Sequence, residues 1–137
     1  MGKWEEIDHT ADLALHLWAD DLADLFITAA RGMFSLIAAP QDDEEDAPSR
    51  AIEISLSALD VETLLVDWLN ELLYLSEIES LVFTGYEMTH LSSNALEATI
   101  SGRPIKMYYN YIKAATFHNL SVDATPDGYE TEIVFDT

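Results

Sequence analysis

Apolar residues recur along the chain with two different periods, which predict helices and strands. Alternating apolar and polar residues over 13–19 predict a strand whose leucines face the core. Apolar positions at helical spacing follow over 22–37, directly after two aspartates that can cap a helix. A second alternation over 52–56 predicts another strand, and Asp60 is a good N-cap for a second helix.

Apolar residues cover well over half the circumference of this second helix, so we expect it to be largely buried. Its narrow polar stripe consists of Asp67, Asn70, Glu71 and Tyr74, at positions i, i+3, i+4 and i+7. The stripe is either a solvated edge or the wall of a site.

The C-terminal half of the chain is dominated by predicted strands. They are expected over 81–83 and 86–91, around 96–100, over 115–123 and over 129–135. Gly102-Arg103-Pro104 is expected to end the strand around 96–100, and an aromatic connector follows over 107–111. Helices that are segregated from a strand-rich half predict an α+β layer fold.

Length and charge narrow the class of protein further. The 137 residues fit a single domain, 1–137, and the formal net charge is -20, from six basic and 26 acidic residues. Such a surface repels phosphate, which argues against direct high-affinity nucleic-acid binding. Three explanations of the acidity remain open: a basic protein partner, cation binding, or solubility in a salt-rich cytoplasm.

Other features of the sequence favour a cytoplasmic protein. The chain has no cysteine, no basic and apolar leader at its start, and no apolar run long enough to span a bilayer. The acidic loop over 40–50, with prolines near both ends, is interpreted as a solvated connector rather than a metal site.

Two acidic segments at opposite ends of the chain could supply oxygen ligands to a hard cation. The first is Asp8-His9-Thr10-Ala11-Asp12, and the second is the ending Asp136-Thr137, which the apolar residues before it should hold in place. A polar strand entry and a frayed end are the plainer interpretations. Asp136 needs a partner from elsewhere, and Asp12 is the candidate if the first and last strands end near each other.

Two further residues near the end of the chain, Lys113 and His118, are candidates for a functional role. Standard catalytic motifs are missing. Lys113 could neutralise a carboxylate cluster or contact phosphate, although a surface ion pair is the plainer interpretation. His118 is expected to be a hydrogen-bonded core residue, and the histidines lack zinc-site spacing. No nucleophile elbow or glycine-rich phosphate loop is present, so an independent nucleotide-hydrolysing enzyme is disfavoured.

Four segments together resemble the archease signature in order and spacing. They are His9-Thr10-Ala11-Asp12, the helix segment 66–74, the segment 112–118 and the ending Val134-Phe135-Asp136. The resemblance spans the chain and implies an α+β fold in which two helices pack on a mostly antiparallel sheet. It also implies an accessory protein, not an enzyme. Archeases serve RtcB-type RNA ligases, which join tRNA exons, by promoting guanylylation of the ligase and its multiple turnover.

The resemblance also implies roles for individual residues. Asp12 and Asp136 would bind a divalent cation, with Thr137 adding a backbone or terminal oxygen. We expect Ca²⁺, with Mg²⁺ or Mn²⁺ as alternatives that the same oxygen ligands allow. Lys113 would act beside this site. The other residues that match the family are Asp67, Glu71, His9 and His118, of which the two histidines are expected to form structural hydrogen bonds.

The sequence departs from the family pattern at two places, and a rival function stays open. Thr137 replaces the usual aliphatic ending, and the connector over 107–111 is aromatic where the family has a charged segment with an Arg-His pair. The rival is a general protein-binding or chaperone-like module whose metal is structural. A metal-dependent hydrolase is a third and less favoured class.

Overall fold

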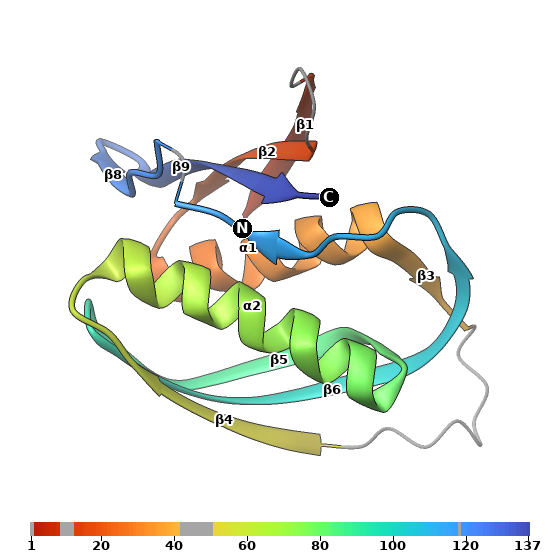
Figure 1. Ribbon diagram of the computed structural model, residues 1–137. Coiled ribbons are helices and arrows are strands. Elements are labelled where there is room, and N and C mark those ends of the chain that lie inside the picture. The colour runs from red at the N-terminus through yellow and green to blue at the C-terminus, as the bar shows by residue number, and fades with distance from the viewer. Residues whose placement is uncertain (1, 9–12, 42–50, 118) are drawn as a thin grey trace.

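The computed structural model describes residues 2–8, 13–41, 51–117 and 119–137. In these residues, two helices lie between two antiparallel sheets, so the chain forms three layers (Figure 1). The helices are α1 (Leu22–Ile37) and α2 (Val61–Glu79). The strands are β1 (Lys3–Asp8), β2 (Leu13–Ala19), β3 (Ala38–Pro40), β4 (Ala51–Ser57), β5 (Leu81–Leu91), β6 (Ala95–Tyr108), β7 (Ala114–Ala115), β8 (Asp123–Thr125) and β9 (Gly128–Asp136).

The first sheet brings the two ends of the chain together. Its strand order is β1-β2-β9-β7, and β8 pairs with the free part of β9 through a tight turn. This turn joins Thr125 to Gly128. Gly128 has a φ of 144° there, and a Cβ atom would lie 2.1 Å from the carbonyl oxygen of Ala19. Strand β9 therefore lies between β2 and the short β7.

The second sheet is organised around β6, which pairs with β3, β4 and β5. The prediction that Gly102-Arg103-Pro104 ends this strand is wrong, because β6 continues to Tyr108. Pro104 lies between the part of β6 that pairs with β4, which ends at Ser101, and the part that pairs with β3, which begins at Ile105. On its other side Pro104 pairs with Leu81 of β5, and its carbonyl oxygen accepts a hydrogen bond from the amide of Gln41. A proline is tolerated at such a position because β6 changes its partner there from β4 to β3, and neither ladder needs its N–H.

Both helices begin at the predicted aspartate caps. The side chain of Asp21 accepts a hydrogen bond from the amide of Asp24, and that of Asp60 accepts one from the amide of Thr63. These bonds satisfy amides that have no partner inside the helix. Hydrogen bonding lowers the pKa of the exposed Asp60 carboxyl, because only the charged form accepts it fully.

The core lies in the helix layer and is closed by both sheets. Trp68 is fully buried, and its indole Nε1–H donates a hydrogen bond of 2.9 Å to the carbonyl oxygen of Phe26, which joins α2 to α1. Tyr86 packs edge-on against Trp68 and donates to the carbonyl oxygen of Phe83. Burial raises the pKa of the Tyr86 phenol, and the nearby Arg31 offsets this only in part.

The predicted α+β class with two helices and mostly antiparallel strands is confirmed, although the strands form two sheets rather than one. The predicted strand over 115–123 is wrong. Among the residues described in this stretch, only the ends of β7 and β8 are strand, because Asn119 has a left-handed φ of 53° and the amide of Leu120 donates back to the carbonyl oxygen of Phe117. Strands β1 and β3 were not predicted, and β3 includes Pro40, which was expected in the acidic loop.

The rest of the acidic loop, over 42–50, lies outside the described residues. Within the described ranges, neither helix combines the length and the apolar composition that a membrane crossing needs.

Candidate cation site at the end of strand β9

Asp136 is the last residue of β9, at the end of the first sheet where β1 ends and β2 begins. Strand β2 pairs with β9 so that Leu13 lies opposite Phe135. Leu13 directly follows Asp12 in the sequence, and Phe135 directly precedes Asp136. The described strands therefore end side by side, as the predicted site requires. Asp12 itself lies outside the described residues.

The strand β7 holds the other side of Asp136. Ala114 pairs with Asp136, and the amide of Lys113 donates a hydrogen bond of 2.8 Å to the Asp136 main-chain oxygen. Phe135 is fully buried, so the alternation of the strand turns the Asp136 side chain away from the core. The side chains of Asp136, Thr137 and Lys113 are all exposed. A carboxylate and an ammonium group are thus both accessible at the end of β9, next to Thr137.

A side chain of α2 fixes β7 in this position. The Asn70 amide oxygen accepts a hydrogen bond of 2.8 Å from the amide of Ala115, and its Nδ2 donates one of 3.3 Å to the carbonyl oxygen of the same residue. This pair of bonds replaces the strand neighbour that β7 lacks on the side facing α2. The polar stripe of α2 is therefore more than a solvated surface, because its Asn70 packs against the end of the first sheet and supports β7.

The sequence placed Asn70 on the polar stripe but not among the site residues. The available signal was that it is the one amide among the three positions 67, 70 and 71. An amide can donate and accept at once, and a single backbone residue presents both groups. Carboxylates cannot do this.

The other predicted residues are only partly brought together. Asp67 and Glu71 are half-buried and lie within a turn of Asn70 on α2. Among the described residues, no three histidine or acidic side chains converge in a way that could hold a metal ion. His9 and His118, like Asp12, lie outside the described residues. The described part of the site is thus Asp136, Thr137 and Lys113, with Asn70 behind them.

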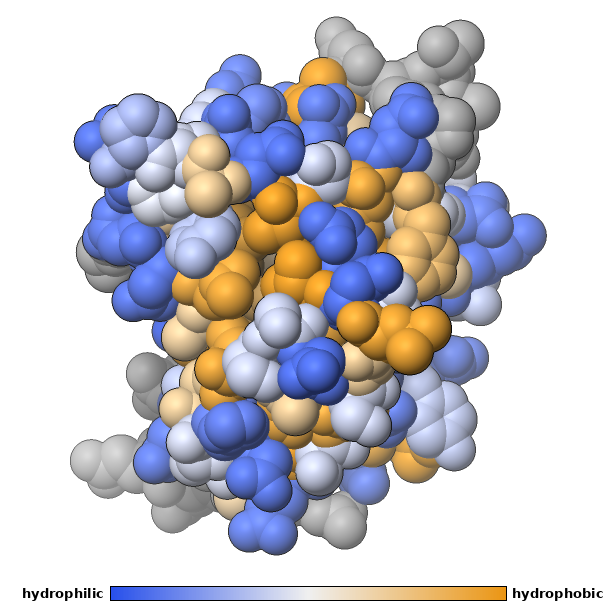
Figure 2. Space-filling model, turned by 90° about the vertical axis from the view of Figure 1, so that its left-hand side faces the viewer, coloured by the Kyte–Doolittle hydropathy of each residue, from blue (hydrophilic) through white to orange (hydrophobic). Residues whose placement is uncertain are grey.

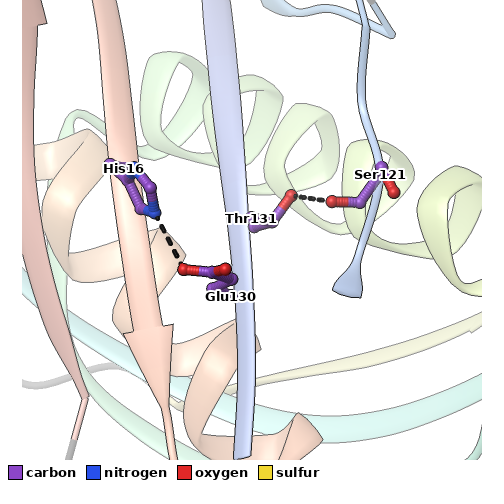
Figure 3. A network of polar contacts seen from close by, with 4 residues as sticks. All are labelled: His16, Ser121, Glu130 and Thr131. Carbon is purple, nitrogen blue, oxygen red and sulfur yellow. Dashed lines mark hydrogen bonds and ion pairs between the residues drawn. The ribbon is translucent and has the colours of Figure 1, made fainter. Parts of the chain in front are cut away.

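A separate group of polar contacts crosses the first sheet farther along β9 (Figure 3). His16 Nε2 lies 3.3 Å from Glu130 Oε2, and the His16 ring stacks on Trp18. The buried hydroxyl of Thr131 donates to the carbonyl oxygen of Ser121. Both contacts join β9 to its neighbours, and we interpret them as structural.

Two helices held between antiparallel sheets, with both chain ends on one sheet, define the class of protein as an α+β fold shared with solved structures. The solution structure of protein 1598 from Methanobacterium thermoautotrophicum superposes with a TM-score of 0.70 over 98% of each chain, at 24% identity. A crystal structure from Thermotoga maritima, of an archease described as a possible chaperone, superposes with a TM-score of 0.67 at 21% identity. It covers 97% of this chain and 96% of that chain.

The chain belongs to the archease protein family (MTH1598/TM1083), whose model matches residues 4–137. It is 33% identical to the protein archease of Methanopyrus kandleri, over 97% of this chain and 98% of that protein. It is also 33% identical to the protein archease of Methanosarcina barkeri, over 99% of this chain and 97% of that protein. The resemblance predicted from the four sequence segments is confirmed.

Proposed function

We propose that this protein is an accessory activator of an RtcB-type RNA ligase in tRNA splicing, and that it acts through a divalent cation held by Asp12 and Asp136. The observation that carries the proposal is the pairing of β2 with β9, which sets Leu13 opposite Phe135. Residues that flank this pair in the sequence are the two carboxylates that the family resemblance implicates. The protein would promote ligase guanylylation and multiple turnover without being an enzyme itself.

The donor set fits a hard cation. Asp136 offers an exposed carboxylate, and Thr137 offers main-chain oxygen next to it. The chain has no cysteine, and its histidines lack the spacing of a zinc site. Ions that prefer oxygen ligands are therefore favoured, with Ca²⁺ first and Mg²⁺ or Mn²⁺ as alternatives. When bound at the ligase, such an ion would neutralise phosphate charge during guanylyl transfer.

The residues around Asp136 would serve as its support. The amide of Lys113 engages the main-chain oxygen of Asp136, which leaves the carboxylate free to face a ligand. The Lys113 ammonium is exposed beside the site and could contact a phosphate oxygen of the nucleotide. Asn70 holds β7, while Asp67 and Glu71 would add negative charge near the edge.

The net charge of -20 supports a protein partner rather than a bare nucleic acid. An acidic surface attracts a basic protein over a distance and raises the rate of encounter. We therefore expect the ligase to present a basic face to this protein, and we expect complex formation to slow as ionic strength rises.

The test is a guanylylation assay with the cognate ligase and the isosteric variants Asp12→Asn and Asp136→Asn. Each should reduce stimulation by at least about tenfold, since mutation of even the outer-shell partners of a metal site typically costs about 10–100-fold in affinity, and loss of a ligand should cost no less. Asp127→Asn is the matched control, because Asp127 is an exposed acid in the turn between β8 and β9, at the opposite end of β9. If all three variants stimulate the ligase as well as wild type, the proposed site is wrong.

A chaperone-like role is the second candidate, and two observations favour it. The Thermotoga maritima archease is described as a possible chaperone. In addition, Figure 2 shows apolar surface gathered on one face, and Leu59, between β4 and α2, is 96% exposed. This role predicts suppression of aggregation of an unrelated denatured client, measured by light scattering. Asp136→Asn should retain it, and Leu59→Ser should weaken it, whereas the ligase proposal predicts the reverse in the guanylylation assay.

A further inference from the structure

A pocket of about 380 Å³ lies between the segment that joins β6 to β7 and the last turns of α2. This segment, residues 109–113, crosses back over the helix layer (Figure 1). The pocket is lined by Ile37 at the end of α1, by Ser76 and Glu77 of α2, and by the three tyrosines Tyr108, Tyr109 and Tyr111.

The three tyrosines present unusually accessible aromatic surface. Tyr108, Tyr109 and Tyr111 are 66%, 55% and 67% exposed. In the described part of the chain, none of these hydroxyls and no carboxylate oxygen of Glu77 forms a hydrogen bond or an ion pair. A buried tyrosine usually has a hydrogen-bond partner for its hydroxyl, whereas these three tyrosines are exposed. Rings left open in this way, next to an unpaired carboxylate, are available to a ligand.

The electrostatics of the pocket favour a cation. Helix α1 ends at Ile37, and Glu77 lies in the last turn of α2, so both helices direct their negative ends toward this region. Neither helix has a basic residue in its last turn. Lys106 and Lys113 flank the segment in the sequence, but neither lines the pocket. The Glu77 carboxylate adds a full negative charge at the wall.

Hydrogen bonds to the last carbonyl groups of α1 hold the segment in place. The amide of Tyr109 donates 2.7 Å to the carbonyl oxygen of Ile37, and Asn110 Nδ2 donates 2.7 Å to that of Leu36. These bonds satisfy carbonyls that the end of α1 leaves without partners. The tyrosines therefore extend from a fixed backbone, and less ordering is needed when a ligand binds.

We propose that this pocket receives an arginine side chain from a basic partner protein. A guanidinium group is planar, weakly hydrated and able to stack on tyrosine while it donates hydrogen bonds to a carboxylate such as Glu77. A lysine ammonium would lose more hydration against these walls. A nucleotide would bring phosphate against Glu77 on a surface of net charge -20.

The pocket adjoins the edge described above. Ile112 lines the pocket, and the amide of the next residue, Lys113, binds the main-chain oxygen of Asp136. A partner arginine in the pocket would therefore lie beside the candidate cation site. The proposal does not depend on that site, since none of the residues that line the pocket is a proposed metal ligand.

The test uses three short peptides that differ at one position, which carries arginine, lysine or the uncharged isostere citrulline. Binding is followed by chemical-shift changes in the full-length protein at about 0.15 M salt, where surface charges are largely screened beyond ~8 Å. We expect the arginine peptide to shift resonances of Asn110 and the three tyrosines saturably. We expect the lysine peptide to bind less tightly and the citrulline peptide to cause no saturable shift.

Two matched pairs of variants separate the pocket from the general acidity. Glu77→Gln should weaken arginine-peptide binding by at least about threefold, while Glu87→Gln, an exposed acid on β5, should not. Tyr111→Leu should weaken it by about two- to fivefold, and Tyr111→Phe should retain it because the ring remains. Equal binding of arginine and citrulline peptides, or equal effects of the two glutamate variants, would overturn the proposal.

Discussion

The Asp136 edge and the tyrosine pocket are neighbours, yet they are built in different ways. At the edge, strand pairing and the Asn70 amide fix the main chain of Lys113, Ala115 and Asp136. In the pocket, the backbone is fixed by the end of α1, but the tyrosine side chains have no partners among the described residues. Side chains in the pocket can therefore change without changing the fold, whereas the edge depends on the fold itself.

The two regions also differ in how closely their sequences match the family pattern. The segments that build the edge match the archease signature, while the tyrosine connector departs from the charged pattern expected there. A constrained edge can support a function common to a family, and an adjacent tolerant surface can adapt to one partner. The four predictions below test whether the two regions are separable, from the largest expected effect to the smallest.

Trp68→Ala should affect both regions, because α2 positions both of them. Trp68 is fully buried and loses its hydrogen bond to Phe26, so we expect a loss of about 3–5 kcal/mol in the free energy of unfolding. Urea denaturation measures it. Trp18→Ala is the control, because Trp18 is 37% exposed on β2 and should cost far less. A loss for Trp68→Ala no larger than the control's would show that α2 is not the shared support.

Asn70→Ala should act on the edge and spare the pocket. It leaves both main-chain groups of Ala115 without their partner, and we expect a loss of about 1–3 kcal/mol. Amide exchange should speed up at Ala115, measured by hydrogen exchange, while arginine-peptide binding stays unchanged. Asn94→Ala, in the exposed turn between β5 and β6, is the control. If peptide binding falls as much as edge protection, the regions are not separable.

The sequence predicted those parts of the fold in which local pattern and burial agree. The strand over 13–19, both helices and the caps Asp21 and Asp60 follow from periodicity and side-chain chemistry. The strand over 115–123 was wrong because a left-handed residue, Asn119, interrupts the pattern. The break at Pro104 was wrong because tolerance of a proline depends on which neighbouring strands pair there, and this is tertiary information.

The candidate site was predictable in its residues but not in its geometry. Asp136 and Lys113 were visible in the sequence, and their connection through a main-chain hydrogen bond requires β7 to pair with β9. Asn70 looked like one polar residue among several, because only the fold reveals that Ala115 needs both a donor and an acceptor. The pairing of Asp12 with Asp136 stays a prediction.

Asn110→Ala should have the opposite selectivity to Asn70→Ala. It removes the 2.7 Å hydrogen bond to Leu36, at an expected cost of about 0.5–1.5 kcal/mol, and it loosens the segment that carries the tyrosines. Arginine-peptide binding should weaken. The amide hydrogen-exchange rate of Ala115 and the stimulation of the ligase at saturating concentrations of this protein should stay as in wild type. Asn110→Asp keeps the size but cannot donate this bond, and it sets a carboxylate against the Leu36 carbonyl at the negative end of α1, so it should lose at least as much stability. Intact peptide binding in both variants would mean that the segment does not organise the pocket.

Asp60→Asn should have the smallest effect and should touch neither region at neutral pH. The pKa of Asp60 is lowered from 3.8 in the folded state by the bonds to Thr63, so its charge stabilises the fold fully above that value. This stabilisation is lost as the pH falls below 3.8 through the lower folded pKa. Asparagine keeps the cap acceptor but does not titrate.

The urea midpoint of wild type should therefore exceed that of the Asp60→Asn variant near pH 6, and the difference should shrink as the solution is acidified toward about pH 2.5. A difference that stays constant over this range would show that the cap acts through hydrogen bonding alone. An effect on peptide binding or ligase stimulation would show that the start of α2 is coupled to the regions near its other turns.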